Sequence, residues 1–199
     1  GWSERVAVLG RSQEAMLRGF KKVQQRLPFS IKQLYPDNGS EFFNDHLIRY
    51  FGEEITGMRL SRSRPYHKND NRFVEQKNST LVRAYVGYDR LDTRAQCAAL
   101  NDLYDQLWLY YNLFQPVMHM TEKEVADGKL HRKHDKAKTP YQRLLTSNIL
   151  LPEQKTRLAA LYAKTNPREL HRKIYQAVEQ LWQNKVSNNS NRKEAALLR

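Results

Sequence analysis

The stretch LYPDNGSEF, residues 34–42, decides the expected fold together with RPYHKNDNRFVEQKN, residues 64–78. In the first stretch, Asp37 closely follows a short apolar segment and precedes a tight turn and a residue that can cap a helix. In the second, a basic, amide-rich loop leads into a helix with Glu75 in its first turn. Each stretch alone is also compatible with ordinary turn and cap chemistry. An acid at the carboxyl end of a strand, however, lies at the edge of an α/β sheet where ligands bind.

The segments around these stretches alternate between strand-like and helix-like patterns. The clearest is a helix at about 95–114, where apolar residues from Leu100 to Phe114 recur on one face and Pro116 ends the pattern. We expect strands at 2–9, 31–35 and 54–60, and helices at 12–27, after Ser40, at 73–85 and at 95–114. Further helices are expected at 140–145, around 158–162 and at 170–182, whereas the structure of 117–138 is left open. The order of elements in the first part predicts an α/β body.

The charge of the chain is concentrated near its C-terminal end. The 199 residues carry 34 Lys and Arg against 21 Asp and Glu, a net charge of +13. Residues 123–199 hold ten of these excess charges, and residues 129–138 are the densest basic segment. This distribution favours a polyanionic partner. A solvated lysine-rich surface, an acidic protein and RNA remain alternatives to DNA at this point.

Two function classes are excluded by composition. A single cysteine rules out a disulfide scaffold and a cysteine-based zinc site. No apolar run approaches the roughly 20 residues that span a bilayer, so we expect no membrane partner. We also expect no secretory leader.

The two stretches resemble the catalytic core of DDE transposases and retroviral-type integrases, and particularly bacterial insertion-sequence transposases. The resemblance rests on DNGSEF (37–42), residues 64–78 and VRAYVGYDR (82–90), with weaker support from YYNLFQP (110–116) and TPYQRLL (139–145). It implies an α/β, RNase H-like integrase core over residues 1–116 that lacks its first strands. A basic, mainly helical C-terminal region would follow at 117–199.

The family's active site, by resemblance, holds two Mg²⁺ (or Mn²⁺) ions with three carboxylates. Asp37 matches the second acid and Glu75 the third. The first acid should lie on the first strand, and Glu4 cannot supply it because it falls in what resembles the third strand. We therefore expect the chain to begin after the first two strands and to be catalytically incomplete by itself. The full-length parent would cut DNA ends and transfer strands.

The same resemblance indicates which residues contact DNA. Arg64, Tyr66, Lys68 and Asn69 occupy the loop that approaches DNA beside the active site, although Tyr66 is equally compatible with a packing role after Pro65. Lys77, Asn78 and Arg83 lie on the helix that follows. Lys129, Arg132 and Lys133 belong to the basic segment. The implied partners are transposon ends and target DNA, bound by a homo-oligomer in a cytoplasmic, nucleoid-associated setting.

Two other interpretations are kept. One is a non-catalytic nucleic-acid-binding remnant, in which residues 123–199 supply the activity. The other is a helical interaction module that has no nucleic-acid role. Binding to DNA that weakens with salt would separate the first of these from the second.

Overall fold

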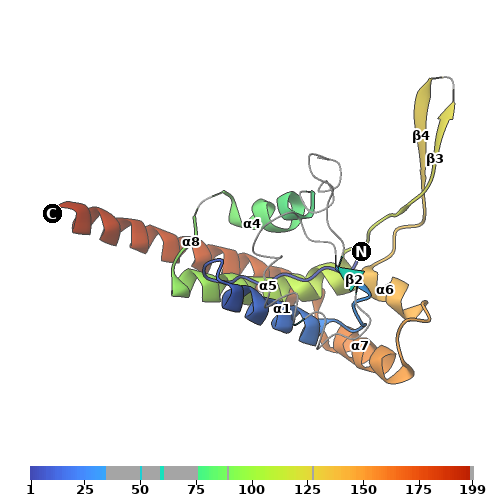
Figure 1. Cartoon of the computed structure of the whole chain (residues 1–199), viewed down its shortest axis with the longest axis horizontal. Helices are drawn as coiled ribbons and strands as arrows, with labels where there is room; N and C mark the ends of the chain where they lie inside the picture. Colours follow the sequence, from blue (N-terminus) through green and yellow to red (C-terminus); the bar gives the residue numbers. More distant parts are fainter. Residues whose placement is uncertain (35–49, 51–58, 61–75, 89, 127, 198–199) are drawn as a thin grey trace. The chain divides into compact units, whose positions relative to one another are not determined.

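A computed structural model describes residues 1–34, 50, 59–60, 76–88, 90–126 and 128–197 (Figure 1). The chain forms two compact units, each treated by itself below. Unit 1 comprises residues 1–5 and 104–175, and unit 2 comprises residues 6–103 and 176–199. The division between the units near residue 103 falls inside a helix, and the domain boundary expected at residue 116 stays a prediction. Within the described ranges, no helix combines the length and apolar character needed to cross a membrane.

Unit 2 begins with the helix expected at 12–27. α1 spans Gln13–Arg26, and the Ser12 hydroxyl caps it by accepting from the backbone N–H of Ala15 at 3.2 Å. The apolar face of α1 packs around the buried ring of Tyr50. The side chains in this cluster are Met16, Leu17, Phe20 and Leu34.

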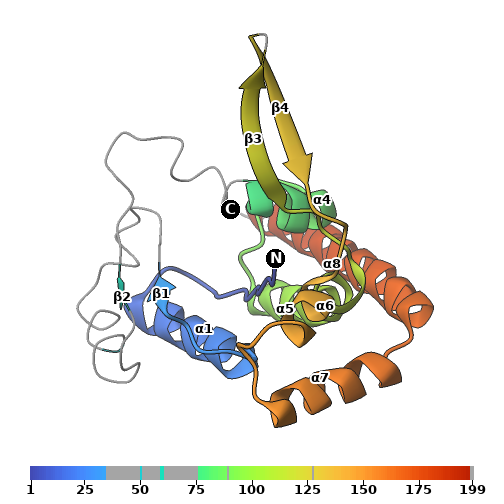
Figure 2. The same cartoon turned by 90° about the vertical axis from the view of Figure 1, so that its right-hand side faces the viewer.

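A short parallel sheet lies in the same unit. β1 (Gln33–Leu34) pairs with β2 (Arg59–Leu60), within the two segments expected as strands (Figure 2). Parallel pairing requires a crossover connection of a dozen or more residues, and 24 residues separate these strands in sequence. This geometry is compatible with the expected α/β class, which stays a prediction. Of the helix expected after Ser40, only Tyr50 is described, and it is helical.

The helix expected at 73–85 is confirmed over its described part. Residues 76–78 are helical, η2 (Ser79–Arg83) makes a π-helical turn, and α4 (Ala84–Val86) completes the helix. It ends at Gly87, where φ is +68°. A positive φ suits glycine, and the Gly87 N–H still donates a 2.9 Å helical hydrogen bond to the carbonyl of Arg83.

The helix expected at 95–114 is confirmed as α5 (Arg94–Leu109) followed by η3 (Tyr110–Phe114). At its start, Thr93 and Gln96 form reciprocal side-chain to backbone hydrogen bonds of 3.1 Å. The helical residues stop two positions before Pro116, as the sequence predicts. α5 contributes residues to both units.

The strand expected at 2–9 is not formed among the described residues. Residues 1–8 belong to no helix or strand, and side-chain amides hydrogen-bond part of their backbone. In unit 1, Asn112 hydrogen-bonds both the N–H and the C=O of Ser3 at 2.9 Å. In unit 2, Asn101 binds the N–H and C=O of Ala7 at 3.1 and 3.0 Å. An amide group can imitate one residue of a neighbouring strand because it offers one acceptor and a donor side by side.

Unit 1 contains a β-hairpin that the sequence analysis left open, and three helices. β3 (Met120–Ala126) and β4 (Lys129–His134) are antiparallel and extend away from the helices of the unit (Figures 1 and 2). α6 (Pro140–Leu145), α7 (Pro152–Lys164) and α8 (Pro167–Leu197) confirm the three expected helices, and α8 continues into unit 2.

Stacked aromatic rings hold the helices of unit 1 together. Tyr162 of α7 stacks on Phe114 of η3 with ring centroids 5.1 Å apart and on Tyr141 of α6 at 4.8 Å. Burial of the Tyr141 ring raises the pKa of its hydroxyl, with a smaller contribution from Tyr162. The base of the hairpin joins this packed region directly before α6.

Candidate nucleic-acid interface

The two acids predicted to bind metal lie outside the described residues. The same is true of the loop residues Arg64, Tyr66, Lys68 and Asn69, so their placement is not described. The structure does place the strand that precedes Asp37, because β1 ends at Leu34, three residues earlier. In the part of the chain that is described, no group of three or more His, Cys, Asp or Glu side chains could hold a metal ion.

The helix after the predicted loop carries three of the expected DNA contacts. Lys77 and Asn78 are exposed, and Asn78 makes no capping hydrogen bond at the start of η2. Arg83 is half-buried and donates a 3.1 Å hydrogen bond to the carbonyl of Gly87. Its guanidinium also lies 5.2 Å from the ring centre of Tyr88. The Arg83 side chain thus helps to cap the C-terminal end of its own helix.

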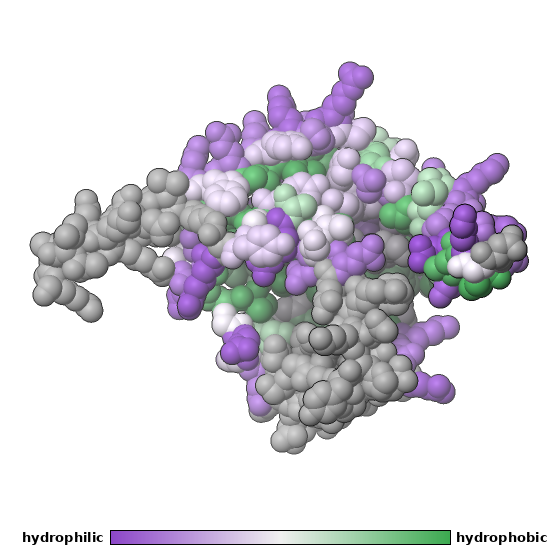
Figure 3. Space-filling model, turned by 90° about the horizontal axis from the view of Figure 1, so that it is seen from above, coloured by the Kyte–Doolittle hydropathy of each residue, from purple (hydrophilic) through white to green (hydrophobic). Residues whose placement is uncertain are grey.

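The other three expected contacts lie on the hairpin. Lys129, Arg132 and Lys133 are all exposed on β4. Lys133 forms an ion pair with Glu122 across the ribbon, with Nζ 2.6 Å from Oε2. The space-filling view shows hydrophilic side chains projecting from much of the described surface, with hydrophobic side chains between them (Figure 3).

The turn residues and one cross-strand pair of opposite charges favour the hairpin. Asp127 and Gly128 separate the two strands, and Asp-Gly is a preferred pair for a two-residue hairpin turn. Gly128 has φ +72°, a backbone angle that residues other than glycine, asparagine and aspartate rarely adopt. The register pairs Glu122 with Lys133 and Lys123 with Arg132, with an irregularity between Met120 and Glu122.

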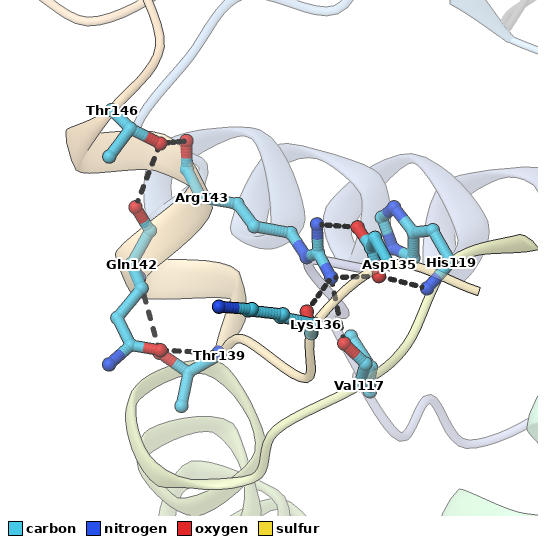
Figure 4. A network of polar contacts seen from close by, with 8 residues as sticks. All are labelled: Val117, His119, Asp135, Lys136, Thr139, Gln142, Arg143 and Thr146. Atoms are coloured by element: carbon cyan, nitrogen blue, oxygen red, sulfur yellow. Dashed lines mark hydrogen bonds and ion pairs between the residues drawn. The ribbon is translucent and has the colours of Figure 1, made fainter. Parts of the chain in front are cut away.

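A polar clamp fixes the base of the hairpin to α6 (Figure 4). The guanidinium of Arg143 donates hydrogen bonds of 2.6 and 3.0 Å to the two carboxylate oxygens of Asp135. It also donates a 2.8 Å hydrogen bond to the carbonyl of Val117. Asp135 accepts a further 2.8 Å bond from the backbone N–H of His119. These donors, Arg143 first and His119 second, hold the pKa of Asp135 well below its usual range. The pKa of Arg143 is raised by the same partner.

Two further contacts complete the clamp. Val117 and Lys138 exchange backbone hydrogen bonds of 3.0 and 3.2 Å below the ribbon. Thr139 and Gln142 form a capping box that starts α6, directly after the hairpin. The chain is therefore hydrogen-bonded to the start of α6 both before β3 and after β4.

Sequence reasoning missed the clamp and one cation of the ribbon. Lys123 lies on β3, directly opposite Arg132, but a single lysine between two glutamates gave no signal in the sequence. The Asp127-Gly128 pair was a signal that could have identified the hairpin. Asp135 and Arg143 are eight residues apart in sequence, and only the turn of chain between β4 and α6 brings them together.

A surface hollow of about 250 Å³ lies in unit 2, beside residues 6–9 and α1. Arg18 and Lys22 line it, together with Gly19, Cys97 and Asn101. The charge of Arg18 is met by Glu14, with Nη1 2.7 Å from Oε1. Two cations line the hollow, whereas β3 and β4 carry Lys123, Lys129, Arg132 and Lys133, so the hairpin is the stronger candidate for a polyanion site.

Comparison with known proteins gives a related sequence. Over 143 residues the chain is 35% identical to "Uncharacterized protein y4rM" of Sinorhizobium fredii (strain NBRC 101917 / NGR234). The match covers 72% of this chain and 40% of that protein, so the chain spans well under half the length of its relative. No family model matches the chain, and no solved structure matches it.

Proposed function

We propose that this chain is part of a DDE-type transposase or integrase, a polynucleotidyl transferase that cuts DNA ends and joins them to target DNA. The proposal rests on the motifs at residues 37–42 and 64–78 and on one structural observation. Asp37 follows β1 by three residues, and β1 is one strand of a parallel pair. The carboxyl edge of parallel strands is where α/β proteins bind their ligands, and it is where this chemistry needs an acid.

The roles of the chain's own residues follow from phosphodiester chemistry. The carboxylates of Asp37 and Glu75 would supply hard oxygen ligands of the kind that Mg²⁺ or Mn²⁺ prefers. When bound, two such ions stabilise the attacking and leaving oxygens of an in-line displacement. Basic residues of the loop would hold phosphates near the reacting bond. The first of the site's three acids would come from a longer protein that contains this chain.

A strand-transfer assay tests this proposal in such a longer protein. Inverted-repeat DNA ends and Mg²⁺ are supplied, and DNA binding is measured separately by fluorescence anisotropy. Asp37→Asn and Glu75→Gln should each lower strand transfer by at least about a hundredfold, because each removes a charge at the site of reaction. Both variants should still bind DNA.

Matched controls are available in the same two stretches. Glu41→Gln and Asp70→Asn remove neighbouring acids and should leave strand transfer within a few-fold of the parent. Equal activity in the parent, Asp37→Asn and Glu75→Gln would show that these acids do not carry the reaction.

A second candidate function is DNA binding without catalysis. It is favoured by the hairpin, whose cations are described and do not depend on the two acids. DNA binding by a longer protein that never cuts or joins DNA would select this candidate.

A further inference from the structure

The β3–β4 ribbon has two faces of different chemistry. Directly paired residues of an antiparallel ribbon point to the same side, and successive pairs alternate between sides. One side, here called the mixed-charge face, carries Glu122, Glu124, Lys129, His131 and Lys133. The other side, here called the cationic face, carries Met120, Lys123, Val125, Leu130, Arg132 and His134.

The charges of the mixed-charge face compensate one another. Glu122 lies opposite Lys133 and forms an ion pair with it at 2.6 Å, and Glu124 lies opposite His131. Two carboxylates thus stand beside the lysines of this face. A polyanion approaching it would meet both acids.

The cationic face places two like charges in direct opposition. Lys123 and Arg132 are paired in register, and no acid of either described strand points to their side. Like charges directly opposite each other destabilise a ribbon, because their repulsion is not offset within it. A row of phosphates would turn this repulsion into attraction and release counterions from the nucleic acid.

The apolar residues of the cationic face are exposed where a partner can reach them. Val125 and Leu130 are directly paired near the turn, with 74% and 42% of their surfaces accessible. Met120, near the base, is 52% exposed. The face therefore presents cations in its middle and an apolar pair close to its tip, and all of β4 is exposed.

We propose that the cationic face enters the major groove of duplex DNA. A two-stranded ribbon fits this groove, which is about 12 Å wide. Lys123 and Arg132 would contact phosphates at the groove walls, while Val125 and Leu130 reach base edges such as the thymine methyl group. The ion pair between Asp135 and Arg143 joins the base of the ribbon to α6. This inference rests on the proposed function for its choice of DNA as the partner.

A charge-matched pair of double variants tests which face binds. The full chain is titrated into a labelled 30-base-pair duplex at several salt concentrations. Lys123→Gln with Arg132→Gln should weaken binding about ten- to a hundredfold at 0.15 M salt and lower the slope of log Kd against log salt by about 2. Lys129→Gln with Lys133→Gln removes the same charge from the same ribbon and should change Kd by less than about threefold.

The apolar tip and the groove are tested separately. Val125→Ser with Leu130→Ser should weaken binding several-fold with an unchanged salt slope, because no charge is removed. Ile149→Ser with Leu151→Ser is the control, since these two side chains are 65% and 64% exposed elsewhere in unit 1. Methyl green, which occupies the major groove, should displace the chain, whereas netropsin in the minor groove should not.

The outcomes separate this inference from the proposed function. Equal weakening by the two charge-matched doubles would overturn the choice of face, and no weakening by either would overturn the hairpin as a DNA surface. In both cases the chain still binds DNA, so the proposed function is not overturned and is decided by the strand-transfer assay. If the unaltered chain binds no duplex at low salt, or binds only single-stranded RNA or an acidic protein, the inference falls together with its DNA partner.

Discussion

Asn112 binds both the N–H and the C=O of Ser3, 109 residues away in sequence. The amide is fully buried in η3 and takes the position that a neighbouring strand would otherwise fill. Replacing Asn112 with leucine would leave both backbone groups of Ser3 without this partner. We expect Asn112→Leu to lower the free energy of unfolding by roughly 1–3 kcal/mol in urea titrations.

Asn148→Leu is the matched control for this loss. Asn148 is exposed, and we expect the same substitution there to change the free energy of unfolding by less than about 0.5 kcal/mol. Equal midpoints for the two variants would mean that the Asn112 amide contributes nothing to the fold of unit 1.

The clamp at the base of the hairpin predicts a pH dependence of stability. The pKa of Asp135 is lowered in the folded chain, chiefly by Arg143. A lowered pKa means that the folded state favours the carboxylate, so its stabilisation is complete above the unfolded value near 3.9 and is lost as pH falls below it. The difference in unfolding free energy between the parent and Asp135→Asn should be constant from about pH 5 to 8 and should shrink below about pH 4.

Glu169→Gln provides the comparison for the clamp. Glu169 pairs with Lys173 one helical turn away, at 3.0 Å, and its side chain is 48% exposed. Its pKa is also lowered, first by the Lys173 hydrogen bond. Solvent screening should make its effect on unfolding smaller than that of Asp135→Asn and should reduce it further in high salt. A larger effect at Glu169 than at Asp135 would contradict the importance assigned to the clamp.

The turn of the hairpin predicts a local change in stability. Gly128→Ala forces a side chain into the left-handed region, which costs about 1–2 kcal/mol. Because the ribbon is exposed, the loss should appear in the opening of the hairpin rather than in global unfolding. Amide hydrogen exchange of residues 120–134 should accelerate while the helices of unit 1 keep their protection.

Gly128→Asn serves as the milder variant at the same position, since asparagine tolerates this conformation. Its amide exchange should fall between that of the parent and of Gly128→Ala. Identical exchange in all three proteins would show that the left-handed turn does not limit the hairpin.

A substitution in the core of unit 1 should lower the free energy of unfolding more than the substitutions above. Leu107 is fully buried on the second half of α5, and Leu107→Ala should lower the free energy of unfolding by about 2–5 kcal/mol. Leu151→Ala, at a position 64% exposed, should have little effect in the same thermal or urea measurement. Similar losses at both positions would mean that α5 is not central to the packing of unit 1.

The sequence predicted the helices well because their apolar faces are buried. The face that runs from Leu100 to Phe114 repeats with helical spacing, and the structure follows it through α5 and η3. The same pattern analysis did not predict the hairpin, because both faces of the hairpin are exposed. Its strands therefore carry no alternation of apolar and polar residues, and only Asp127-Gly128 marked the turn.

The residues of the candidate site also differ in how far the sequence alone could predict them. Asp37 and Glu75 could be selected only by resemblance, since each acid also suits an ordinary turn or helix start. The density of basic residues predicted Lys129, Arg132 and Lys133 as DNA contacts. Charge density does not show which face of a strand each side chain occupies. Register separates them, because Arg132 shares a face with Lys123 whereas Lys133 faces Glu122. Pairing between strands is a property of the folded ribbon that a list of charges does not contain.

The double grip of Arg143 on Asp135 has a mechanical consequence. A ribbon joined to its support by a loose hinge would absorb any pull at its tip by swinging. Here the segments before β3 and after β4 are both hydrogen-bonded to Arg143 of α6, so we expect a force on the tip to reach the start of α6. A partner bound at Val125 and Leu130 would then load the helix that carries Tyr141, whose ring stacks on Tyr162.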